Sequence, residues 1–133
     1  MIFDTDILSN IVKQEPSYVL VEKLTKVPRE LQFTSAITIG EIYYGAHRSN
    51  RKKRIIEAFN NYVFHNVTVV PFDEESGKVF GEIKAILEKK RLSCSEPDIR
   101  IAAIAIHHNM ILITGNTKHF SNIPNLEIEN WIT

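Results

Sequence analysis

Three carboxylates that lie far apart in the chain, Asp4, Glu41 and Asp98, are the residues with which this protein could do chemistry. Mg²⁺ and Mn²⁺ are hard cations that prefer oxygen ligands, and nuclease sites hold them with several acids in one cleft. Such a site needs no cluster of histidine or cysteine. If the fold brings the three acids together, they indicate metal-dependent hydrolysis of a phosphodiester.

Each of the three acids also has a purely structural interpretation. Asp4 follows the apolar pair Ile2-Phe3, where an ionised carboxylate is costly without a partner, but it could simply cap the next helix. Glu41 could be a solvated residue beside the apolar stripe of its helix. Asp98 could be a first-turn acid that the helix dipole favours. No acid is convincing alone, so the hypothesis depends on their convergence.

Polar and small residues beside these acids have their own expected roles. We interpret Asp6, two residues into a turn between strand and helix, as a helix cap rather than a ligand. Thr5 could orient either neighbouring carboxylate or stabilise the turn. Gly40 and Gly45 flank Glu41, and because glycine is unfavourable inside a helix, they predict close approach of another element.

Histidines and basic runs offer weaker signals. The basic run 51–54 and the run 89–91 could pair with phosphates, but solvated helix surface explains them better. Zinc sites use characteristic spacings of histidine, cysteine and acidic residues. No such spacing is visible around His47, His65, His107 and His108.

Composition is that of an ordinary globular protein. The chain has 133 residues, of which 44% are hydrophobic and 24% charged, so we expect one domain over residues 1–133. Sixteen basic residues balance sixteen acidic ones, and net charge therefore names no partner. Cys94 is the only cysteine, which excludes an internal disulfide and favours a cytoplasmic location. No signal peptide or membrane segment is expected.

Strand and helix patterns alternate along the chain. Apolar runs predict strands at residues 1–4, 31–36, 67–72, 110–114 and 126–128. Helices are expected from Thr5-Asp6, from Pro16 to before Pro28, over 38–48 and 50–62, from a cap at Asp73, and from Pro97 to about His108. This alternation predicts an α/β fold with a mostly parallel sheet that helices cover on both faces.

In such sheets ligands bind beyond the carboxyl ends of the strands. Asp4 follows one predicted strand, Glu41 lies one helical turn past another, and Asp98 opens a helix. Asn116 follows the strand that ends at Thr114. These residues are therefore expected at one edge of the sheet.

Four segments in order also carry a family resemblance. They read Ile-Phe-Asp-Thr-Asp-Ile-Leu, Ile-Gly-Glu-Ile-Tyr-Tyr-Gly-Ala, Pro-Asp-Ile-Arg-Ile-Ala-Ala-Ile-Ala and Ile-Leu-Ile-Thr-Gly-Asn-Thr-Lys-His-Phe. The whole chain resembles a PIN domain, and more narrowly a VapC-type toxin ribonuclease of a toxin-antitoxin pair. Each segment alone is a weak signal, but four in order are a strong one.

The resemblance implies a PIN-like three-layer α/β/α sandwich. It implies that Asp4, Glu41 and Asp98 are the catalytic, metal-binding acids, with Thr5, Thr114 and Asn116 in support. Mg²⁺ or Mn²⁺ would activate a water for attack on RNA. Relatives often cut structured RNA such as tRNA. The implied partners are a cognate antitoxin and a second copy of the chain in a homodimer.

Two positions depart from the family pattern. His119 stands where relatives supply a fourth acid, and a neutral imidazole ligates Mn²⁺ but binds Mg²⁺ poorly. Asp6 stands where relatives often have Asn, and it could restore the missing negative charge. The number of metal ions, one or two, therefore stays open.

Two alternative functions remain at this point. In a haloacid-dehalogenase-like phosphatase, Asp4 would be the nucleophile and Asp6 the general acid, although the lysine and further acidic pair of that chemistry are not recognisable. In a catalytically silent PIN-like module that binds RNA or protein, His119 would mark the decay of the site.

Overall fold

Five parallel strands form the centre of the molecule. The computed structural model describes residues 1–133. The sheet has the order β3-β2-β1-β4-β5, and all four neighbouring pairs are parallel. Strand order reverses at β1, so the β1–β4 junction is a topological switch point. The strands are β1 (Ile2–Phe3), β2 (Phe33–Ser35), β3 (Thr68–Val70), β4 (Leu112–Ile113) and β5 (Ile128–Glu129).

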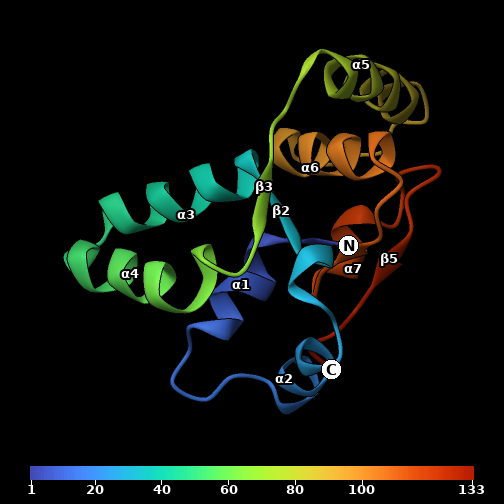
Figure 1. Cartoon of the computed structure of the whole chain (residues 1–133). Helices are drawn as coiled ribbons and strands as arrows, with labels where there is room; N and C mark the ends of the chain where they lie inside the picture. The colour runs from blue at the N-terminus through green and yellow to red at the C-terminus, as the bar shows by residue number, and fades with distance from the viewer.

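Helices cover both faces of this sheet, which confirms the predicted α/β architecture (Figure 1). Successive strand residues point to opposite faces, so Ile2 belongs to one apolar core and Phe3 to the other. The first core lies under α5 and α6, and the second under α1, α2 and α4. The helices are α1 (Thr5–Ile11), α2 (Tyr18–Thr25), α3 (Ala36–Arg48), α4 (Lys52–Phe59), α5 (Glu74–Lys89), α6 (Glu96–His107) and α7 (Thr117–Phe120). None of these helices combines the length and the hydropathy that a membrane span requires.

Side-chain caps define where most helices begin. Ser17, Ser35, Asp73 and Ser95 each accept a hydrogen bond from a backbone N–H in the first turn of α2, α3, α5 and α6. The predicted cap at Asp73 is thereby confirmed. Pro16 precedes the cap of α2 instead of lying in its first turn. In place of the single helix expected over 50–62, the structure has α4 followed by a π-helical turn at Asn60–Phe64. The short helix α7 was not predicted.

Gly40 and Gly45 correct one prediction. A Cβ atom at either position would meet nothing within 4 Å, because both residues lie on the exposed face of α3. The predicted close approach of another element to this face is therefore wrong within the chain.

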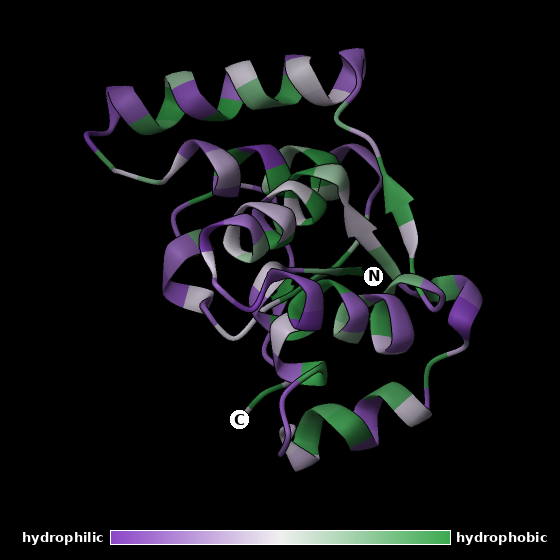
Figure 2. Cartoon of the chain, turned by 90° about the vertical axis from the view of Figure 1, so that its left-hand side faces the viewer, coloured by the Kyte–Doolittle hydropathy of each residue, from purple (hydrophilic) through white to green (hydrophobic).

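Hydrophobic residues also reach the surface on α2. Figure 2 shows this short helix at the bottom of the molecule as mostly hydrophobic. Tyr18 is 80% exposed and Val21 is 44% exposed. This helix therefore carries apolar side chains that do not pack into the core.

Candidate metal-dependent active site

Asp4 lies buried where β1 ends and α1 begins. Its backbone N–H donates to the carbonyl of Ile113 at 2.9 Å, which ties it to the neighbouring strand β4. Its Oδ1 accepts from the Thr5 N–H and its Oδ2 from the Thr114 hydroxyl, both at 2.8 Å. The side chain is only 5% exposed. Asp4 thus caps α1 and also presents a carboxylate at the switch point of the sheet.

Burial raises the pKa of Asp4 to about 7, against the hydrogen bonds from Thr114 and Thr5, which lower it. The negative charges of Asp6 and Asp98 raise it further. A carboxyl group in these surroundings is partly protonated at neutral pH. A bound cation would favour its ionised form.

Glu41 is held beside Asp4 by Thr5. The Thr5 hydroxyl donates to Glu41 Oε1 at 2.7 Å. It also lies 3.4 Å from the hydroxyl of Thr38, a buried residue in the first turn of α3. Glu41 is half-buried and its Oε2 is left free. The Thr5 side chain therefore takes neither expected role: its hydroxyl orients the carboxylate of Glu41, not that of the neighbouring Asp4 or Asp6.

Asp6 is not the cap of α1, because Asp4 fills that position. Asp6 Oδ2 instead accepts from the Gly115 N–H at 2.8 Å, and Oδ1 lies 3.4 Å from the Thr114 hydroxyl. Since β1 and β4 are parallel neighbours, the first turn of α1 faces the loop that follows β4. The Asn116 N–H donates to the Thr114 hydroxyl at 3.0 Å, so Thr114 connects this loop to Asp4.

Gly115 is a residue that the sequence reasoning missed. A Cβ atom here would lie 2.7 Å from Ile132 Cδ1 and 2.8 Å from Asp6 Oδ2. Only glycine leaves room for the Asp6 carboxylate to reach the backbone. In the sequence, its position directly after a predicted strand, between Thr114 and Asn116, could have indicated its role.

Asp98 lies in the first turn of α6, with its side chain 17% exposed. His119 Nδ1, on the short helix α7, is 3.6 Å from Asp98 Oδ2. A cleft of about 560 Å³ opens beside them, and Lys118 also lines it. Cys94 borders the same cleft, but burial and the charge of Asp98 raise its thiol pKa to about 11, which leaves it unreactive at neutral pH.

Asp4, Glu41 and Asp98 do not form a tight cluster. The one group of three acidic, histidine or cysteine side chains with ligand atoms all within 4.8 Å lies elsewhere in the molecule. Mg²⁺ usually keeps several waters and uses one or two carboxylates directly, so further acids can act on such an ion through its bound waters.

The comparisons with known proteins decide the family. The model of the PIN domain matches residues 1–126. The chain belongs to the PIN-domain family. Within this family it belongs with the VapC ribonucleases, since it is 31% identical to Ribonuclease VapC2 of Haemophilus influenzae over 97% of this chain and 96% of that protein.

Two further PIN-domain relatives bear on function. A tRNA(fMet)-specific endonuclease VapC of Salmonella typhimurium is 25% identical, over 96% of this chain and 95% of that protein. The crystal structure of VapBC2 from Rickettsia felis bound to a promoter DNA fragment superposes with a TM-score of 0.88 and 28% identity, covering 98% of this chain and 99% of that one. Membership of this family removes the support for the phosphatase alternative.

Proposed function

We propose that the chain is a metal-dependent endoribonuclease and the toxin of a toxin-antitoxin pair. The observation that carries the proposal is the buried Asp4 carboxylate, whose two oxygens are oriented by Thr5 and Thr114 and whose pKa is raised to about 7 beside further acids. Family membership supports the reaction class.

Asp4, Glu41 and Asp98 would hold Mg²⁺ or Mn²⁺. The donor set fits, because it consists of carboxylate oxygens and because a cation would offset the buried charge of Asp4. When bound, a divalent cation would supply Lewis-acid chemistry, activating water and stabilising charge on the phosphate. Thr5 and Thr114 fix the directions of Glu41 and Asp4, and Asp6 holds the loop that carries Asn116.

His119 and Lys118 would contribute to RNA binding. Both line the cleft beside Asp98, where the Lys118 ammonium can pair with a phosphate and the His119 ring can donate a hydrogen bond to one. His119 places an imidazole where a fourth acid is expected, so we propose that one divalent ion suffices and that His119 contacts the substrate.

Structured RNA is the proposed substrate class, because the Salmonella typhimurium relative is named for tRNA(fMet). The test uses purified protein freed of any partner, incubated with total tRNA and Mg²⁺ or Mn²⁺. We expect cleavage that excess chelator stops and that Asp4→Ala or Asp98→Ala abolishes. Equal cleavage in chelator would exclude the mechanism. RNA affinity without divalent binding at millimolar concentration would instead support the silent module.

The proposed partner is a cognate antitoxin. The relatives of known structure include a VapBC complex, and this chain has an apolar groove of about 430 Å³ between α2 and the π-helical turn. Val21, Leu24 and Tyr62 line it, and Tyr62 is 63% exposed. Val21→Asp should prevent the product of an adjacent small gene from inhibiting cleavage while leaving the cleavage itself unchanged. The predicted homodimer is tested by the mass of the purified protein in solution.

A further inference from the structure

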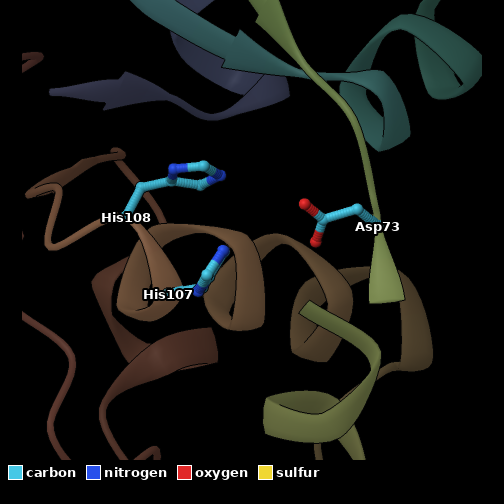
Figure 3. A group of neighbouring side chains, drawn as sticks. All are labelled: Asp73, His107 and His108. Atoms are coloured by element: carbon cyan, nitrogen blue, oxygen red, sulfur yellow. The ribbon is translucent and has the colours of Figure 1, made fainter. Parts of the chain in front are cut away.

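A second group of potential ligands lies at the far end of α6 from Asp98. The side chains of Asp73, His107 and His108 each offer one ligand atom, and these three atoms all lie within 4.8 Å of one another. Figure 3 shows the three side chains turned toward a common space. Sequence spacing gave no sign of this group, since the fold brings the distant Asp73 to the two histidines.

Helix ends create this arrangement. Asp73 is the cap of α5, His107 is the last residue of α6, and His108 is its C-cap. Consecutive side chains on a continuing helix point in directions about 100° apart. Because the chain leaves the helix at His108, the two rings come to lie with their centroids 4.5 Å apart.

The donor atoms remain available for a ligand. Asp73 Oδ1 accepts from the Ser76 N–H at 2.9 Å, which leaves Oδ2 free. That hydrogen bond holds the pKa of Asp73 below its usual range, so the group is ionised at neutral pH. Neither His107 nor His108 takes part in an ion pair. Asp73 and His108 are exposed and His107 is half-buried, so an ion can reach them from solvent.

We propose that Asp73, His107 and His108 bind one borderline divalent metal ion, Zn²⁺ or a transition metal of similar chemistry. Two imidazole nitrogens and one carboxylate oxygen suit Zn²⁺ far better than Mg²⁺, with water in the remaining position.

This site is separate from the acidic one. Asp98 lies nine residues before His107 on α6, which at 1.5 Å per residue is about 13 Å along the helix axis. An ion bound here joins the start of α5 to the end of α6, the two helices over one face of the sheet. Zn²⁺ should therefore stabilise the folded state, by an amount that grows with the logarithm of its concentration above Kd, without taking part in RNA cleavage.

The experiment measures Zn²⁺ binding by calorimetry and thermal unfolding, with Mg²⁺ in excess to occupy the acidic site. The wild-type chain should bind one equivalent of Zn²⁺ and unfold at a higher temperature with it. Asp73→Ser, which keeps a good helix cap, and His107→Ala should each weaken Zn²⁺ binding at least tenfold. Co²⁺ should give the absorption bands of a tetrahedral or five-coordinate site, and His108→Ala should remove them.

Two matched variants make the outcome decisive. His65→Ala removes a histidine outside the group and should leave Zn²⁺ binding unchanged, and so should Asp98→Ala. Unfolding temperatures in chelator identify any variant that fails to fold. Zn²⁺ binding that survives the loss of both His107 and His108, or that disappears in Asp98→Ala, would overturn the proposal.

Discussion

Thr114 donates a 2.8 Å hydrogen bond to Asp4 although 110 residues separate them in the chain. The contact exists because β1 and β4 are parallel neighbours that end at the same edge of the sheet. The Thr114 hydroxyl also accepts from the Asn116 N–H, so one side chain orders both the central acid and the loop after β4. Several properties of the site depend on this connection.

Removal of the Thr114 hydroxyl should weaken metal binding. Thr114→Val keeps the shape of the side chain but takes from Asp4 the hydrogen bond that favours its ionised form, a contact of about 1.5–3 kcal/mol. We expect Mn²⁺ to bind at least tenfold more weakly at pH 7, as measured by calorimetry. Thr114→Ser should bind Mn²⁺ nearly as well as wild type, and the exposed Thr68→Val should have no effect. Normal affinity in Thr114→Val would contradict this role.

Asp4 should make the metal-free protein less stable as the pH rises. The unfolded chain releases this proton near pH 3.8, whereas the folded protein keeps it until about pH 7. Between these values the folded state binds more protons, so the free energy of unfolding falls with pH, by on the order of 4 kcal/mol in total. In chelator, Asp4→Asn should have the same free energy of unfolding as wild type near pH 4 and a higher one than wild type at pH 8. If urea titrations give the same difference in the free energy of unfolding between Asp4→Asn and wild type at every pH in this range, the raised pKa of Asp4 is refuted.

Metal binding should show the opposite pH dependence. Because the ion requires the ionised form of Asp4, Mn²⁺ affinity should fall about tenfold for each pH unit below 7. Binding should release a proton near neutral pH, which calorimetry in buffers of different ionisation enthalpy measures. Affinity that is flat between pH 5 and 7 would show that Asp4 is already ionised without metal.

Gly115→Ala should disturb the site through a steric clash. The added methyl would lie 2.7 Å from Ile132 and 2.8 Å from Asp6, so Asp6 must leave the Gly115 N–H. We expect a loss of about 1–3 kcal/mol in the free energy of unfolding together with weaker Mn²⁺ binding. Gly81→Ala on α5 is the matched control, since a Cβ there meets nothing within 4 Å, and it should stabilise the chain by up to about 1 kcal/mol.

His119→Glu should change the metal stoichiometry. A carboxylate at this position would lie beside Asp98, from which His119 Nδ1 is now 3.6 Å away. Two adjacent acids favour a second divalent ion, so we expect two Mn²⁺ per chain instead of one, counted by electron paramagnetic resonance. The variant should be less stable than wild type in chelator because the two like charges repel. His65→Glu serves as the control, and a single Mn²⁺ in His119→Glu would count against the expectation.

Local patterns in the sequence determined the elements and their order. Apolar runs predicted all five strands to within a few residues, and the cap at Asp73 and the proline at Pro97 marked the starts of α5 and α6. These features depend on hydrogen bonds and packing between residues close in the chain, so they can be read without the fold. The same local patterns, together with the family motifs, indicated Asp4, Glu41 and Asp98 as candidates.

The tertiary structure alone decided which partners each side chain meets. Asp6 was expected to cap a helix, but the pairing of β1 with β4 directs it to Gly115. Gly40 suggested a close neighbour, yet its side of α3 faces solvent. Asp73 and His107 gave no joint signal until the ends of α5 and α6 met. Such contacts depend on strand order and helix packing, which arise from the whole chain and leave no trace in local spacing.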